Sequence, residues 1–212
     1  MRAACFLILV LTYTSCDMSS HSNPYLKSWS EADQEYLLTH LDVSLQGIID
    51  EVKPLTEAQW NWRTDTSEWS IAQVVEHLIV HDELFSREVR VLTALPEMIA
   101  QNDSLFSDDA SILSYSEITL QNTGNSPSYM EPLGRWCSKE DAVMAYSRIR
   151  RSLIDFVKTC DKDLRKYYTA SGRGPTRYRD IHQLLLISIA HTQRHLSQIQ
   201  NIKLSKNPDF GN

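Results

Sequence analysis

Four long stretches of this sequence repeat apolar residues every three or four positions, which is the spacing of one face of an α-helix. They cover residues 30–54, 70–92, 138–160 and 176–203. No stretch alternates convincingly as a half-buried β-strand would. Four amphipathic helices without a strand predict an all-α fold. We expect a four-helix bundle with a long connection, residues 95–136, between the second and third helices.

Local signals mark where these helices begin. A Ser followed three positions later by Asp or Gln is the pattern of an N-terminal capping box. It occurs three times, in the pairs Ser30 and Asp33, Ser70 and Gln73, and Ser138 and Asp141. We take Thr176 as the N-cap of the last helix and expect one more short helix at residues 112–120. The connector at residues 55–69 has no regular pattern. Its Trp60, Trp62 and Trp69 are interpreted as core residues, each with a large apolar surface to bury; they could also line a pocket.

The composition is that of one soluble globular domain, which we assign to residues 28–206. The chain has 212 residues, of which 42% are hydrophobic and 23% charged, and its formal net charge is −6. Because the balance is acidic and no basic block interrupts it, nucleic acid is excluded as a partner. A small molecule is the expected ligand, and a homodimer is compatible with such a bundle.

The N-terminus has the layout of an export signal at residues 1–15. A short positive start is followed by an apolar run that is too short to span a bilayer, and then by small residues. Cys16 comes next, as in a bacterial lipoprotein, where this cysteine carries the lipid; Tyr13 departs from the usual aliphatic residue. We expect the polar residues 16–27 to be a tether and the protein to be exported. It would be held at the periplasmic or cell-surface side of a membrane through this lipid alone, or else be secreted.

Two further cysteines flank the third predicted helix. Cys137 and Cys160 lie at its opposite ends, and a helix rises by about 1.5 Å per residue. Their separation of roughly 30 Å is too large for a disulfide, so we predict that they do not pair.

Two pairs of histidines have a spacing that places both side chains on one face of a helix. His77 and His81 lie in the second predicted helix, and His191 and His195 lie in the last one. If these helices pack side by side, three imidazoles could converge on one divalent ion and leave a position open for water or substrate. The competing interpretation is ordinary helical histidines satisfied by hydrogen bonds. At 100° per residue His81 lies at the edge of the apolar face and His77 lies one step beyond it, so periodicity alone favours His81.

Three segments carry a resemblance to a known family. They read LTEAQWNWR at residues 55–63, EWSIAQVVEHL at residues 68–78 and HTQRHLSQI at residues 191–199. Together they resemble the DinB-like superfamily (DinB_2 type), above all the branch that includes the bacillithiol and mycothiol S-transferases. The resemblance covers roughly residues 30–204 and implies a four-helix bundle. It also implies a divalent metal held by one histidine of the second helix and two of the fourth.

Carried over residue by residue, the resemblance names His77, His191 and His195 as the metal ligands, because His77 precedes the Leu of the family's E-H-L segment. His81 and Asp82 would then lie beside the ligands and support them. The ion implied is zinc, nickel or iron.

The chemistry expected of such a site is hydrolysis by an activated water or S-transfer by an activated thiol. The family is mostly cytoplasmic, whereas this chain carries an export-like signal, so an intracellular thiol does not follow as its substrate. Glu76, Asp82 and Glu83 are the acids within about a turn of the histidines, and we favour a solvated helix face for them over a general base. The alternative function is a non-catalytic exported helical bundle that binds a partner.

Overall fold

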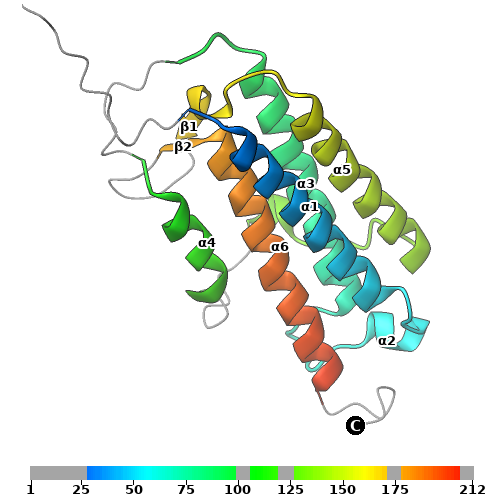
Figure 1. Ribbon diagram of the computed structural model, residues 1–212. Coiled ribbons are helices and arrows are strands. Elements are labelled where there is room, and N and C mark those ends of the chain that lie inside the picture. The colour runs from blue at the N-terminus through cyan, green and yellow to red at the C-terminus, as the bar shows by residue number, and fades with distance from the viewer. Residues whose placement is uncertain (1–27, 99–105, 119–126, 171–177, 206–212) are drawn as a thin grey trace, which may run out of the picture.

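The computed structural model describes residues 28–98, 106–118, 127–170 and 178–205. Four long helices run along one another in this part of the chain (Figure 1). They are α1 (Glu31–Val52), α3 (Ile71–Thr93), α5 (Lys139–Thr159) and α6 (Ile181–Leu204). The predicted all-α four-helix bundle is therefore confirmed. The signal, the tether and Cys16 lie outside the described residues, so export and lipid attachment stay predictions.

The order of the helices around the bundle decides which of them can share a site. Both α1 and α3 pack against α5 and against α6. The first two long helices therefore occupy diagonal corners, and α3 and α6 lie side by side although a large part of the chain separates them. The helix pairing that the histidine site requires is present.

Side-chain capping marks all four long-helix starts, and three of the four caps were predicted correctly. The side chains of Ser30, Ser70 and Ser138 each accept a hydrogen bond from the backbone N–H three residues later, as predicted. The prediction for the last helix was wrong. Its N-cap is Asp180, which forms a capping box with Gln183, and Thr176 lies outside the described residues.

Shorter elements complete the described structure. They are α2 (Glu57–Asn61), α4 (Asp109–Ile118), η3 (Ser128–Met130), η4 (Leu164–Lys166), β1 (Tyr168–Ala170) and β2 (Tyr178–Asp180). Helix α4 is the expected short helix with an earlier start, and α2 lies in a connector for which no helix was predicted. The two strands pair antiparallel, with Thr169 opposite Arg179, and correct the expectation of no strand. Three residues are too few to display an alternation in the sequence.

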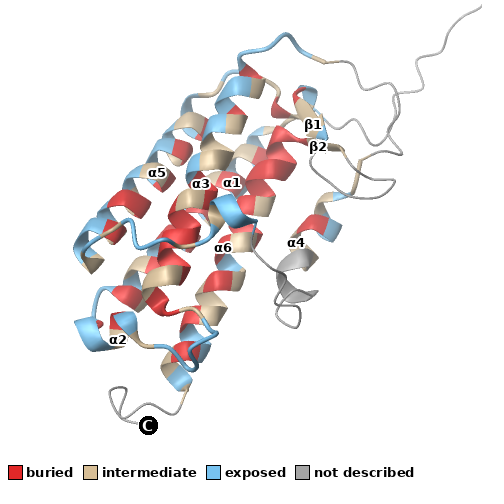
Figure 2. Ribbon diagram, turned by 180° about the vertical axis from the view of Figure 1, so that it is seen from behind, coloured by how far each residue is buried: buried red, intermediate tan, exposed pale blue. Residues whose placement is uncertain are grey.

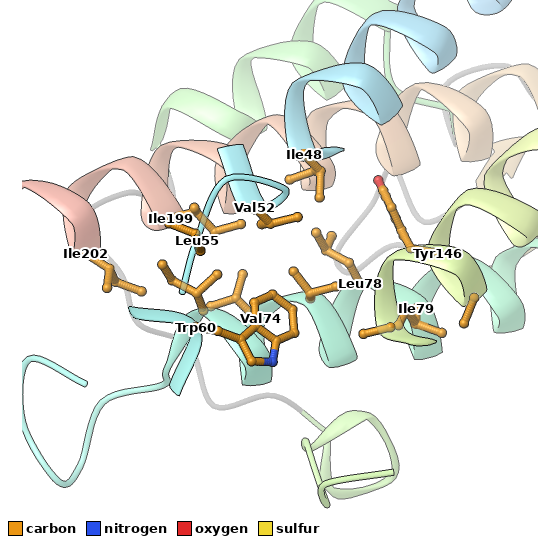
Figure 3. Packing of buried hydrophobic residues seen from close by; sticks show 14 of the residues in the cluster. Ile48, Val52, Leu55, Trp60, Val74, Leu78, Ile79, Tyr146, Ile199 and Ile202 are labelled. Carbon is orange, nitrogen blue, oxygen red and sulfur yellow. The ribbon is translucent and has the colours of Figure 1, made fainter. Parts of the chain in front are cut away.

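The buried apolar side chains form two clusters, one toward each end of the bundle, on the faces that the helices turn inward (Figure 2). One contains Val52, Trp60, Val74 and Ile199 (Figure 3), and the other is built around residues such as Leu41. Trp62 and Trp69 pack partly buried against the first cluster, in agreement with their assignment to the core. Along each long helix the two clusters are separated by about a turn or two that carries buried polar residues.

A cluster of charged residues ties together the end of the bundle where α1 and α6 begin. The Arg165 guanidinium lies 3.3 Å from Asp33, 2.7 Å from Asp109 and 3.3 Å from Asp180. These carboxylates belong to α1, to α4 and to the N-cap of α6. His182 lies beside them, 3.9 Å from Asp33. One cation therefore links η4 to three helix starts.

Two further expectations concern the cysteines and the membrane. Cys137 and Cys160 are both free thiols, which confirms that they do not pair. Among the helices of the described ranges, none combines the length and apolarity needed to cross a bilayer.

Candidate metal centre

Three imidazoles meet between α3 and α6. The Nε2 atom of His191 lies 3.2 Å from Nε2 of His77 and 3.1 Å from Nε2 of His195. One ligand atom from each ring lies within 4.8 Å of the other two, and within the described residues this is the one group of its kind. His77 and His195 are buried, whereas His191 is half-buried. The structure thus brings together the three residues that the family resemblance named.

The hydrogen bonds of two of these rings decide where their protons are. Nδ1 of His77 lies 3.0 Å from the Met130 carbonyl oxygen, which can only accept, so Nδ1 carries the hydrogen. Nδ1 of His195 donates in the same way to the side-chain oxygen of Gln198 at 2.8 Å. Both neutral rings therefore present the lone pair of Nε2 toward Nε2 of His191.

This donor set fits a divalent ion. Two imidazole nitrogens bound to one tetrahedral ion at about 2.1 Å lie roughly 3.4 Å apart, close to the separations observed here. A single proton on Nε2 of His191 could serve only one of the two facing lone pairs, and Arg194 is a second donor for that of His195, whereas a cation between the rings would accept all three lone pairs at once. His191 differs in its Nδ1, which is buried and has no hydrogen-bond partner.

Burial keeps the rings neutral, as metal ligation requires. It lowers the pKa of His77 to about 4. It also lowers the pKa of His191 and of His195 well below the ordinary value, and the positive charge of Arg194 acts in the same direction on all three. The lone pairs are consequently available across the neutral pH range.

His81 contacts the cluster from one side. Its ring stacks on that of His191, with centroids 3.8 Å apart and planes tilted by 17°, and its Nδ1 donates to Asp82 at 3.3 Å. The preference for His81 over His77 from helical periodicity was wrong, because the packing of α3 on α6 turns His77 inward. His81 instead supports the ring of a candidate ligand.

Asp82 belongs to a polar layer that is fully buried in the middle of the bundle. Its carboxylate lies 2.9 Å from the Arg150 guanidinium and accepts a hydrogen bond from Ser188 at 3.0 Å. Arg150 donates in turn to Ser188, Thr192 and the Tyr146 hydroxyl. Burial alone would raise the pKa of Asp82, but the Arg150 charge and the bonds from His81 and Ser188 hold it below its ordinary value.

Glu76 binds a segment of the long connection, residues 133–135, to helix α3. Its carboxylate accepts hydrogen bonds from the backbone N–H groups of Leu133, Gly134 and Arg135, and from the Arg135 guanidinium at 2.7 Å. Gly134 has a φ of 74°, a conformation that lets successive N–H groups point at one anion. The same connection supplies the Met130 carbonyl that orients His77.

These contacts overturn the assignment of the three acids to a solvated helix face. Glu76 and Asp82 are buried and bound to arginines, and only Glu83 is exposed. Neither buried carboxylate contacts the three Nε2 atoms in any described interaction. Sequence reasoning missed Arg135 and Arg150 because their partners are far away in the chain. In the sequence, the one hint of such a contact was Glu76, the acidic residue next to His77.

Two more residues border the cluster: Trp69, for which lining a pocket was the alternative to a place in the core, and Arg194, which was not predicted there. The Trp69 ring lies 5.0 Å from that of His77 and is stacked against that of His195 at 6.5 Å. Arg194 donates from Nη2 to Nε2 of His195 at 3.0 Å. The candidate site therefore has an aromatic neighbour and a cationic one.

The sequence belongs to a known family, and the fold is shared with a solved structure. The sequence matches the DinB superfamily over residues 40–199, and the chain belongs to this family. The structure is similar to that of YfiT from Bacillus subtilis, described as a probable metal-dependent hydrolase with an unusual four-helix bundle topology. The TM-score is 0.56 at 13% sequence identity, over 84% of this chain and 89% of YfiT. No curated protein matches the chain.

Proposed function

We propose that this protein is a metal-dependent enzyme that hydrolyses a small molecule, with one divalent ion held by His77, His191 and His195. The observation that carries the proposal is the convergence of the three Nε2 atoms, two of which have their lone pairs fixed toward the third. Zinc, nickel and iron all accept such imidazole ligands. The bound ion would lower the pKa of a coordinated nucleophile and polarise the substrate.

The surrounding residues hold the ligand rings in place. The Met130 carbonyl and the Gln198 side chain fix the tautomers of His77 and His195, and the His81 ring packs flat on that of His191. Such outer contacts commonly change metal affinity about 10- to 100-fold when they are removed. Three protein ligands leave part of a tetrahedral or larger coordination sphere for the substrate or a water molecule, which is the pattern of catalytic rather than structural sites.

Hydrolysis is preferred over S-transfer because YfiT, which has a similar fold, is described as a probable metal-dependent hydrolase. The S-transferases of the resemblance remain the second candidate. No described cysteine is near the histidines in the chain, so a thiol used in S-transfer would come from a second substrate.

The first experiment is metal analysis of the purified full chain and of His191→Ala. We expect about one equivalent of zinc, nickel or iron in the wild type and a loss of at least about 90% of it in the variant, because two ligands hold a divalent ion far more weakly than three. His40→Ala changes a histidine of α1 that lies outside the cluster and serves as the control. Circular dichroism shows whether each variant keeps its helices.

A metal-free, fully folded wild type that also fails to take up added zinc, nickel or iron would overturn the proposal in favour of the non-catalytic binding bundle. Metal-loaded protein can then be assayed with esters and amides, with and without low-molecular-weight thiols. Turnover that requires a thiol would replace hydrolysis by S-transfer.

A further inference from the structure

A groove on the surface of the bundle, between α3 and α5, gathers three cations. It has a volume of about 460 Å³. Arg87 and Arg90 line it from α3 and Arg148 lines it from α5, and Glu83 is the one acid among its lining residues. Three positive charges less one negative charge leave the groove with +2, in a chain whose formal net charge is −6. The sequence shows no basic block here because the arginines come from two helices.

The three arginines differ in what they contact. Nη2 of Arg90 donates to the carbonyl oxygen and to the hydroxyl of Ser152, both at 2.8 Å, and its guanidinium lies 5.4 Å from the centre of the Phe156 ring. Arg87 and Arg148 are exposed, and neither has a hydrogen bond or an ion pair with any other described residue. Two guanidinium groups, one on each helix, are therefore available to a ligand in the groove.

The charge of the groove selects the kind of ligand. Like charges at close range repel each other, and an anion between them removes the repulsion. A phosphate monoester carries about −1.5 to −2 near neutral pH and has three acceptor oxygens, so it matches a charge of +2. A guanidinium binds such a group through paired N–H donors. A carboxylate would leave half of the positive charge unmatched.

Apolar side chains beside the arginines suit the organic part of the same ligand. Val91 and Ile149 line the groove, and Val91 is 57% exposed. Covering this apolar surface stabilises a complex by roughly 25 cal/mol per Å² removed from water. The volume of the groove also falls within the range of about 300–1,000 Å³ that is usual for small-molecule sites. A small organic phosphate fits these features better than a bare inorganic ion.

We propose that this groove is a second binding site, for a small molecule that carries a phosphate monoester group. Arg87 and Arg148 bind the phosphate from the two helices, and Arg90 adds the third positive charge. The site is separate from the candidate metal centre, because none of the three histidines lines the groove. Arg87 lies ten residues beyond His77 on α3, which corresponds to about 15 Å along the helix axis. The inference does not depend on the metal-dependent function.

The test is isothermal titration calorimetry of the full chain with phenyl phosphate, and with benzoate, which keeps the ring but carries a carboxylate. We expect the wild type to bind phenyl phosphate at least about tenfold more tightly than benzoate. Arg87→Met and Arg148→Met should each weaken phenyl phosphate at least about tenfold, as expected for the loss of a charged hydrogen bond. Arg148→Lys should weaken it less than Arg148→Met, because a lysine keeps the charge but not the paired donors.

Arg151→Met is the matched control. Arg151 is an exposed arginine of α5 that does not line the groove, so its loss should change the affinity by no more than about twofold. Phosphate held by a metal ion at the histidines would be insensitive to all of these substitutions. A loss of affinity confined to Arg87→Met and Arg148→Met therefore locates the phosphate in the groove.

Sedimentation with phosphatidylcholine vesicles, with and without phosphatidate, distinguishes a lipid headgroup from a soluble ester as the source of the phosphate. Binding that requires phosphatidate and is lost in both methionine variants supports the site and assigns the phosphate to a lipid. Binding of phenyl phosphate without binding to vesicles supports the site and assigns it to a soluble ester.

Three results would overturn the proposal. The first is a wild type that binds neither phenyl phosphate nor phosphatidate vesicles. The second is benzoate binding as tight as that of phenyl phosphate, which would exclude selection of a phosphate. The third is an equal loss of affinity in Arg151→Met and in the two groove variants, which would show a general attraction of anions to the surface.

Discussion

At the scale of single residues, the buried pair of Asp82 and Arg150 is a costly arrangement. Both side chains have no exposed surface. Taking two charges out of water costs several kcal/mol per ion, and their attraction offsets this only when the remaining polar atoms are also satisfied. Ser188, Thr192 and Tyr146 supply such contacts to Nη1 and Nη2 of Arg150 and, from Ser188, to Asp82, whereas the buried Nε of Arg150 has no hydrogen-bond partner in the described structure. The pair also borders the candidate site, since Asp82 accepts from His81.

The first prediction concerns the coupling of this pair. Arg150→Met should lower the free energy of unfolding by about 3–5 kcal/mol, because it leaves the Asp82 carboxylate buried without a counter-charge. Adding Asp82→Asn should restore part of the loss, so that the double variant is more stable than the single arginine variant. Urea denaturation of the wild type, both single variants and the double variant measures the coupling.

Arg148→Met is the matched control for that cycle. Arg148 lies on the same helix but is exposed, so its replacement should change stability by no more than about 0.5 kcal/mol. Strict additivity of the two buried substitutions would show that the charges do not depend on each other.

The histidines show what a sequence can and cannot say about individual side chains. The spacing of four residues was enough to place each pair on one face of a helix. Choosing between His77 and His81 needed the rotation of α3 about its axis, which is set by packing on α6 and not by local sequence. The family resemblance supplied this information indirectly, through the E-H-L segment.

At the scale of elements, the segment that precedes α5 is held to α3 by an unusually complete set of bonds to one carboxylate. Glu76 receives three backbone N–H groups and the Arg135 guanidinium. This attachment sets the position of Met130, whose carbonyl orients His77. Two neighbouring residues of α3 therefore bind this segment, Glu76 through its carboxylate and the candidate metal ligand His77 through its ring.

The second prediction tests that attachment. Glu76→Gln keeps the shape of the side chain but removes its charge, so the bonds to Leu133, Gly134 and Arg135 should weaken. We expect amide hydrogen exchange of these three residues to become at least about tenfold faster. Metal affinity should fall about tenfold, because the Met130 carbonyl no longer holds His77 as firmly.

Glu83→Gln provides the comparison for Glu76, since Glu83 lies on the same helix but is exposed. It should leave both hydrogen exchange and metal affinity unchanged. Unaltered exchange at residues 133–135 in Glu76→Gln would contradict the role assigned to Glu76.

Helix starts were the most predictable elements, because a cap is encoded within four residues. Ser30, Ser70 and Ser138 illustrate this. The start of α6 was missed because β2 ends at Asp180, the cap itself, and its pairing with β1 has no local signature. The contacts of Glu76 were missed for the same reason, since its partners are more than 50 residues further along the chain.

At the scale of the whole molecule, the Arg165 cluster joins elements from both halves of the chain at one end of the bundle. It brings three carboxylates around one guanidinium, so one of the acids must bear the cost of the excess negative charge. Burial raises the pKa of Asp180 to about 6, from an ordinary value of 3.8, although Arg165 acts in the opposite direction. The free energy of unfolding should therefore depend on pH in a way that reflects the raised pKa of Asp180.

The third prediction follows from the sign of that shift. Because the pKa of Asp180 is higher in the folded than in the unfolded chain, its contribution to stability is fully present below about pH 3.8 and is lost as the pH rises through about 6. Asp180→Asn cannot ionise and still caps α6. The difference in free energy of unfolding between Asp180→Asn and the wild type should therefore shift in favour of the variant from pH 4 to pH 7, by at most about 3 kcal/mol.

Asp109→Asn should show the opposite slope in the same denaturation experiments. Burial acts to raise the pKa of Asp109, but the bond to Arg165 outweighs it and leaves the value below the ordinary one. This carboxylate therefore stabilises the fold at neutral pH, and the benefit is lost as the pH falls. Parallel pH profiles for the two variants would rule out this division of roles within the cluster.

The pairing of α3 with α6 has a consequence for how the protein matures. His77 on α3 and His191 on α6 are 114 positions apart, and α6 must dock against α3 before the two rings can meet. During synthesis the first three long helices leave the ribosome with only one of the three candidate ligands. Metal capture by all three residues must therefore wait until α6 has emerged, and a product stalled before α6 would present no complete site to the ions around it.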